Sequence, residues 1–84
     1  MNCYLVMTRR LPSFDPQWLE AHYAFLEALR RGERLELAGP FSDGSGGAYL
    51  FRARSLDEAQ AIAETDPLFR HKCSDVHLHE WRAQ

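Results

Sequence analysis

The 84-residue sequence is poor in lysine and has no long hydrophobic run. Its single lysine is Lys72, and its arginines are scattered along the chain. The scattered basic residues and the net charge of −2 argue against the clustered basic surface that binding to nucleic-acid phosphates requires. No apolar stretch is long enough to span a bilayer, and the first residues lack the basic start and apolar run of a signal peptide. We therefore expect a cytoplasmic protein that binds neither nucleic acid nor membrane.

Cysteine is also scarce, with Cys3 and Cys73 in the first and last predicted strands. We expect two buried free thiols in a reducing compartment. A disulfide between them stays open as an alternative, because it needs the two strands to be neighbours with suitable geometry.

The length predicts one domain over residues 1–84, and 45% hydrophobic with 26% charged residues is typical of a globular chain. Periodicity predicts strands over 2–8, 34–41, 48–53 and 73–81, helices over about 16–31 and 56–65, a hairpin loop over 42–47 and a helical turn over 68–71. Asp15-Pro16 is a helix start, and Ser55 with Glu58 is a capping box.

The apolar stripes of the two helices follow a spacing of three to four residues. The first stripe is expected to contain Trp18, Ala21, His22, Phe25, Ala28 and Leu29, widened by Leu19, Tyr23 and Leu26. The second is expected to contain Leu56, Ala59, Ile62 and Ala63.

The order β-α-β-β-α-β predicts an α+β, ferredoxin-like fold, in which a four-stranded antiparallel sheet carries both helices on one face. The strand over 2–8 has apolar groups on both faces, with Leu5 and Met7 on one and Tyr4 and Val6 on the other. The face without helices therefore needs a cover, and we expect a second copy of the chain to supply it.

His22 lies inside the first apolar stripe, and Asp66 follows the second helix in an Asp66-Pro67 step. A buried imidazole needs a partner, and the fold lets the end of the second helix approach the middle of the first. A carboxylate on one ring nitrogen fixes the tautomer and leaves the other nitrogen for proton transfer. The alternative is a structural pair that pins the helices together.

Other candidate sites have weaker patterns. The segment from Gly39-Pro40 to Gly47 could wall a pocket and offer backbone N–H groups, or be an ordinary hairpin turn. His77 and His79 share a strand face and could form a transition-metal pair, or simply a polar strand face; because no zinc-type spacing is present, we expect the polar strand face and no metal. Cys73 is a poor candidate nucleophile, because buried thiols are generally inert.

Several segments, taken in their order and spacing, match the pattern of one known family: Tyr4-Leu5-Val6, His22 with Phe25-Leu26 and Leu29, Gly32, Leu35, Leu37 to Phe41, Ser55 to Ala59, and Asp66-Pro67. Through them the sequence resembles, over nearly its whole length, the YciI-like (YCII-related) family of the dimeric α/β-barrel superfamily. The resemblance implies a homodimer with two sheets packed face to face and a pocket near His22. It places the family's His–Asp pair on His22 and Asp66, and its Gly-Pro on Gly39 and Pro40.

The wider superfamily contains muconolactone isomerases, and one branch resembles dehydrochlorinases. The leading expectation is thus a small-molecule enzyme of lyase or isomerase type, without cofactor or metal, in which His22 is general acid or base and Asp66 orients it. Arg9 and Tyr49, near strand ends, are expected to line the pocket. The expected partners are a small organic ligand and a second copy, with higher homo-oligomers open. The alternative is a non-catalytic metabolite-binding or accessory domain.

Overall fold

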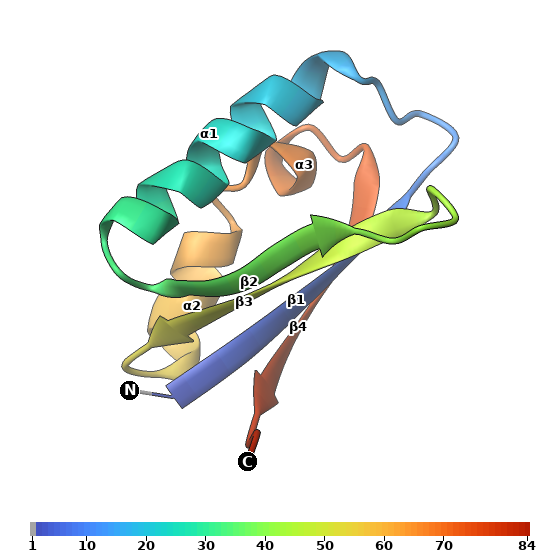
Figure 1. The fold of residues 1–84 in the computed structure, drawn as a ribbon. Coiled ribbons are helices and arrows are strands. Elements are labelled where there is room, and N and C mark those ends of the chain that lie inside the picture. Colours follow the sequence, from blue (N-terminus) through green and yellow to red (C-terminus); the bar gives the residue numbers. More distant parts are fainter. Residues whose placement is uncertain (1) are drawn as a thin grey trace.

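The structure, a computed structural model, describes residues 2–84 and has the predicted order of elements (Figure 1). The elements are β1 (Asn2–Arg10), α1 (Gln17–Arg31), β2 (Leu35–Pro40), β3 (Gly46–Ala53), α2 (Leu56–Ala63), α3 (Pro67–Arg70) and β4 (Ser74–Trp81). The helical turn expected at 68–71 is the short helix α3. None of the helices in this part of the chain is long and apolar enough to cross a membrane.

The sheet has the strand order β2-β3-β1-β4, and every neighbouring pair is antiparallel. The helices cover one face of this sheet (Figure 1). The α+β, ferredoxin-like prediction is therefore confirmed. The end of β1, the end of β2 and the starts of β3 and β4 meet at one end of the sheet, because Arg9 pairs with Gly46 and Asp75 and Pro40 pairs with Gly47.

The two faces of β1 differ as the alternation predicts. Tyr4 and Val6 are buried under the helices, whereas Leu5 is half-buried and Met7 exposed on the open face. The core under the helices consists of Tyr4, Val6, Leu26, Tyr49, Phe51, Ala53, Ala59 and Ala63.

Helix α1 begins at Gln17, one residue later than predicted, and the Asp15 carboxylate accepts a hydrogen bond from the Gln17 N–H at 3.0 Å. Its buried stripe is centred on His22 and Leu26. Tyr23, which was expected to widen the stripe, is exposed, and the predicted burial of Ala21 and Ala28 is wrong, since both are exposed. Both lie about 100° or more around the helix axis from the centre of the stripe.

Helix α2 starts with the predicted cap, because the Ser55 Oγ accepts a hydrogen bond from the Glu58 N–H at 3.1 Å. A complete capping box would have the Glu58 carboxylate accept a hydrogen bond from the Ser55 N–H, but it accepts from the Arg54 N–H and from the Arg34 guanidinium. These two hydrogen bonds lower the pKa of Glu58. The helix ends at Ala63, before the predicted Thr65. Leu56 is 51% exposed, so its predicted burial is wrong: the first turn projects past the core.

Ser55→Ala is expected to lower the free energy of unfolding by about 1 kcal/mol, because an orphan N–H of the first turn loses its acceptor. Urea unfolding checks this. Ser42→Ala, in the exposed loop before β3, is the matched control and should change stability little. Equal losses from the two variants would show that the cap contributes nothing.

Cys3 and Cys73 are both free thiols. Strands β1 and β4 are neighbours, but Cys3 pairs with Trp81 whereas Cys73 precedes Ser74, the partner of Arg10. The two cysteines therefore lie at opposite ends of the strand pair, and the disulfide alternative is excluded.

The β2–β3 hairpin is tighter than predicted, because Gly46 and Gly47 belong to β3 and not to the loop. A Cβ atom at Gly46 would overlap the Thr8 carbonyl oxygen on the neighbouring strand. Glycine thus allows β3 to begin pairing with β1 at this position, where any larger side chain would overlap the backbone of β1.

Candidate functional site

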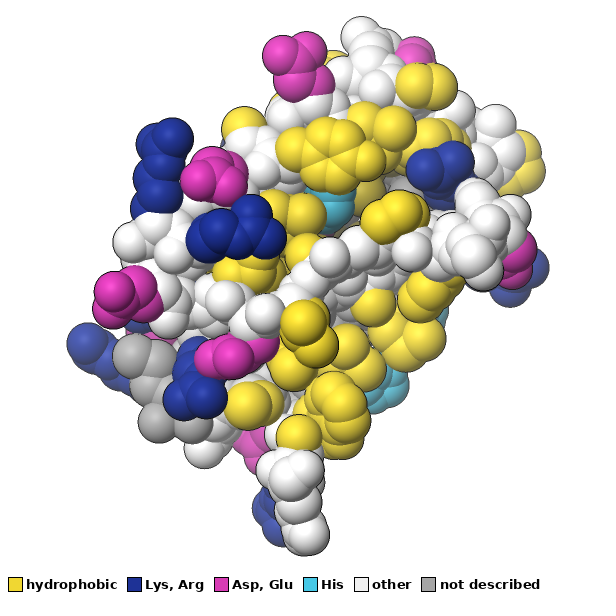
Figure 2. Space-filling view, viewed as in Figure 1, with side chains coloured by type: hydrophobic (Ala, Val, Ile, Leu, Met, Phe, Trp, Pro, Cys, Tyr) yellow, Lys and Arg dark blue, Asp and Glu magenta, His cyan; other side chains and the backbone are white. Residues whose placement is uncertain are grey.

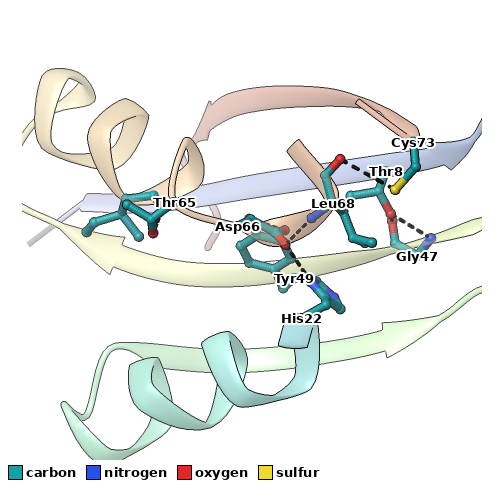
Figure 3. Close-up of polar contacts among 9 residues, drawn as sticks. Thr8, His22, Gly47, Tyr49, Thr65, Asp66, Leu68 and Cys73 are labelled. Atoms are coloured by element: carbon teal, nitrogen blue, oxygen red, sulfur yellow. Dashed lines mark hydrogen bonds and ion pairs between the residues drawn. The ribbon is translucent and has the colours of Figure 1, made fainter. Parts of the chain in front are cut away.

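His22 and Asp66 meet between α1 and α3 (Figure 3). The His22 Nδ1 lies 2.8 Å from the Asp66 Oδ1, with the imidazole 11% and the carboxylate 0% exposed. His22 comes from the centre of the α1 stripe, and Asp66 lies in the short connection between α2 and α3. The structure therefore joins the two residues that the sequence pointed to, 44 positions apart.

Asp66 has three hydrogen-bond donors around it. Its Oδ1 also accepts from the Leu68 N–H at 3.0 Å, which makes Asp66 the N-cap of α3, and its Oδ2 accepts from the Tyr49 hydroxyl at 3.1 Å. A fully buried carboxylate is stable only when its oxygens are satisfied in this way. The capping role was missed in the sequence, although Asp66-Pro67 has the same pattern as Asp15-Pro16.

Tyr49 lies within β3 and is 2% exposed. Burial, followed by the Asp66 charge and the hydrogen bond to Asp66, raises the pKa of the Tyr49 phenol far above its ordinary value. The phenol is therefore a permanent donor to Asp66. Together, Tyr49 and the Leu68 N–H fix the carboxylate that faces His22.

Tyr49→Phe is expected to make stability less dependent on pH in the alkaline range. Because the pKa of Tyr49 is raised in the folded state, the unfolded chain loses this proton first, from about pH 10. The free energy of unfolding then falls as the pH rises further; below that value both states are protonated and this group adds no slope. Urea unfolding from about pH 8 to about pH 11 measures the slope.

The matched control for this pH series is Tyr23→Phe, because Tyr23 is 54% exposed. It should keep the alkaline slope of the wild type. Parallel slopes for the wild type and Tyr49→Phe would contradict the raised pKa of Tyr49.

The network assigns the hydrogen of the neutral imidazole to Nδ1, because the Asp66 carboxylate only accepts. The other ring nitrogen, Nε2, then carries a lone pair. It makes no hydrogen bond to any residue in the range 2–84. His22 also lines a cavity, so this nitrogen is available to a small molecule.

The cavity has a volume of about 310 Å³ and lies at the end of the sheet where β1, β2, β3 and β4 meet, under α1. Figure 2 shows a histidine side chain at the floor of a hollow with hydrophobic groups around it and basic side chains on either side. Its lining includes Arg10, Phe14, Leu19, His22, Leu26, Gly39, Pro40 and Tyr49. The volume is at the lower end for small-molecule sites.

Five of the six residues singled out in the sequence thus lie at this site, and Arg9 does not. Gly39, Pro40 and Tyr49 line the cavity with His22, and Asp66 lies behind it. Arg9 shares the open face of β1 with Met7, whereas its neighbour Arg10 lines the cavity. Nearness to a strand end was the wrong criterion, because successive side chains of a strand point to opposite faces of the sheet and only one face borders the cavity.

The family of the chain follows from two comparisons. The model of the YCII-related domain matches residues 4–82. The uncharacterized protein YjpA of Bacillus subtilis (strain 168) is 42% identical over 82 residues, which cover 98% of this chain and 96% of YjpA. The chain belongs to the YCII-related family.

Solved structures show the same fold as this YCII-related protein. One is the 5-chloro-2-hydroxyhydroquinone dehydrochlorinase TftG from Burkholderia phenoliruptrix AC1100, in complex with 2,5-dihydroxybenzoquinone. It superposes with a TM-score of 0.79 and is 21% identical in sequence, and the match covers 98% of this chain and 95% of TftG. Another is muconolactone isomerase: TM-score 0.73, 16% identity, covering 98% of this chain and 90% of the isomerase. At these identities the likeness concerns the fold.

The remaining histidines of this YCII-related protein lie outside the cavity. His77 and His79 are exposed on the open face of β4, and His71 stacks on Trp18 with 3.5 Å between ring centroids. Within residues 2–84, no three His, Cys, Asp or Glu side chains lie close enough together to hold a metal ion.

Proposed function

We propose that this YCII-related protein is a small-molecule enzyme of lyase or isomerase type in which His22 transfers a proton and Asp66 orients it. One observation carries the proposal: the Nδ1 of His22 is held by Asp66, while Nε2 has no protein partner in residues 2–84 and belongs to a side chain that lines a cavity. This is the arrangement that a general base needs.

The chemistry follows from the two nitrogens. Nε2 accepts a proton from a carbon beside a carbonyl or a conjugated ring, and the resulting imidazolium shares its positive charge with Asp66. Return of the proton to a different carbon completes an isomerisation. Departure of a leaving group with its bonding electrons, from the carbon next to the deprotonated one, completes an elimination.

The fold relatives support a small organic ligand. Two solved structures with this fold are a dehydrochlorinase, in complex with a dihydroxybenzoquinone, and an isomerase. The apolar residues Phe14, Leu19 and Leu26 in the cavity wall suit a ring of that size, since even a cavity of about 150 Å³ accepts benzene. The substrate class that we propose is therefore a small cyclic carbonyl or phenolic compound.

The alternative is a metabolite-binding or accessory domain in which the His–Asp pair is structural. A structural pair would have both ring nitrogens of His22 satisfied by protein groups. The unpartnered Nε2 favours the enzyme.

A screen of cyclic acids, quinols and cyclic ketones by thermal shift tests the proposal, because a ligand of the folded state raises apparent stability. Hits are then incubated with the protein in D₂O, and exchange of the carbon-bound proton is followed by NMR. If the protein is such an enzyme, the carbon-bound proton of a hit exchanges with D₂O, and His22→Asn abolishes this exchange. Hits that bind without exchange or turnover would instead support the binding domain.

We also propose that the protein is a homodimer in the reducing cytoplasm, where the two free thiols remain reduced. The open face of the sheet has an apolar centre: Leu50 pairs there with Leu5 and Leu37, beside Met7 and Trp81. Leu37 is 70% exposed and Trp81 48% exposed in the single chain. An apolar face of this kind usually packs against a partner.

Sedimentation is expected to show a dimer at micromolar concentration, and Leu50→Arg to shift it to the monomer, because a charge would be buried at the centre of the interface. Arg52→Leu, at an exposed position near the end of the same strand, serves as control and should stay dimeric. A stable wild-type monomer would contradict the proposal.

A further inference from the structure

The Ser74 hydroxyl is a polar group that the fold leaves without a partner. Ser74 is the first residue of β4, is 7% exposed and lines the cavity. Its Oγ atom has almost no exposed surface, and among the side-chain oxygens and nitrogens of residues 2–84 that are buried to this extent, it is the one that lacks a hydrogen bond. Such a group is unfavourable unless something else satisfies it. Rotation about its Cα–Cβ bond redirects the hydroxyl, so a ligand oxygen in the cavity can do so.

Arg10 is the second unpaired group of the cavity wall. Its guanidinium lies over the Phe14 ring, 4.4 Å from the centroid, and no carboxylate in residues 2–84 pairs with it. Arg30, the other arginine of the wall, is paired with Glu27 at 3.1 Å. Arg10 is thus the one arginine of the cavity wall whose charge no carboxylate of residues 2–84 compensates. The backbone of Arg10 is held by a 2.8 Å hydrogen bond from its N–H to the Ser45 carbonyl oxygen.

Arg10 and Ser74 are direct partners in the β1–β4 register. Directly opposite residues share a sheet face, with Cβ atoms about 4.5–5.5 Å apart. Both residues line the cavity, so the guanidinium and, after rotation about the Cα–Cβ bond, the hydroxyl can donate to one ligand group. Thr8, the next residue on this face, is already bonded to Gly47 at 3.2 and 3.3 Å.

We propose that the cavity binds a cyclic carboxylate, whose carboxylate group is held by Arg10 and Ser74 while its ring lies against the apolar wall. This deepens the proposed function, on which it rests, by naming the charged group of the substrate. A planar carboxylate matches the fork of a guanidinium and accepts a further bond from a hydroxyl. Binding the anion at one end of the cavity leaves the ring carbons for the Nε2 of His22.

Benzoate and benzamide are the probes, because they share size and shape and differ in charge. Binding to the full chain is measured by calorimetry or NMR titration at neutral pH. We expect benzoate to bind at least about tenfold more tightly than benzamide, as a charge-assisted pair does relative to a neutral one. Arg10→Gln should abolish this preference, and Ser74→Ala should weaken both probes several-fold.

Arg9→Gln is the matched control, since it removes the same charge from the other face of β1 and should leave the preference intact. Circular dichroism confirms that each variant is folded. Equal affinities for the two probes, a preference that survives Arg10→Gln, or no benzoate binding at millimolar concentration would each overturn the proposal.

The same titration with His22→Asn separates this proposal from the proposed function. Arg10 and Ser74 hold the anion without His22, so the preference for benzoate should persist in that variant. Selective benzoate binding together with proton exchange that survives His22→Asn would refute the role of His22 and leave the anion site standing.

Discussion

His22→Asn is expected to lower kcat/KM for a substrate found in the proton-exchange screen by about 10²–10⁴-fold, the usual contribution of a general base. Asparagine is the informative replacement, because its amide nitrogen can donate to Asp66 as Nδ1 does. It has no counterpart of the basic Nε2. The expected loss is therefore catalytic, with the fold retained, and steady-state kinetics with urea unfolding measures the two separately.

His71→Asn is the matched control for this loss. His71 stacks on Trp18 at the surface and does not line the cavity. Its replacement should leave kcat/KM within about twofold of the wild type, since a group away from the reacting atoms contributes little transition-state stabilisation. A His22→Asn enzyme as active as His71→Asn would disprove the general-base role.

Asp66→Ala is expected to cost about 3 kcal/mol or more of unfolding free energy. The substitution leaves three buried donors without an acceptor: the His22 Nδ1–H, the Tyr49 hydroxyl and the Leu68 N–H. Each buried unsatisfied donor costs about 1–3 kcal/mol, and the α3 cap is lost as well. This is a large share of the about 5–15 kcal/mol that stabilises a domain.

Asp66→Asn keeps the shape and an acceptor oxygen, so it should cost clearly less than Asp66→Ala in urea unfolding. Asp57→Ala, an exposed acidic residue in the first turn of α2, should cost less than about 1 kcal/mol. If Asp66→Ala were no more destabilising than Asp57→Ala, the three donors would not depend on Asp66.

Much of the site could be predicted from local patterns. His22 was identified because an ionisable residue stood inside an apolar stripe, and Asp66 because a proline step marked a helix end. Arg10 could have been found too: Tyr4 and Val6 define the buried face of β1, and Arg10 has their parity. Nearness to a strand end alone pointed to Arg9, which lies on the opposite face of β1.

Contacts across the fold could not be predicted in this way. The Tyr49–Asp66 hydrogen bond joins β3 to the connection between α2 and α3, and it depends on how close α3 packs to the sheet. The pairing of Arg10 with Ser74 depends on the β1–β4 register, which the hydrophobic pattern fixes only to within two residues. The exposure of Ala21 likewise reflects how α1 is rotated against the sheet, and that of Leu56 reflects how far the first turn of α2 lies from the core.

Asp66 holds the Nδ1–H of His22 and leaves Nε2 bare in the cavity. The ¹⁵N chemical shifts of the neutral His22 ring, measured by NMR on the labelled protein, test this arrangement. We predict a hydrogen on Nδ1, an unprotonated Nε2, and loss of this tautomer preference in Asp66→Ala. A hydrogen found on Nε2 in the wild-type protein, with Nδ1 bare, would contradict this arrangement.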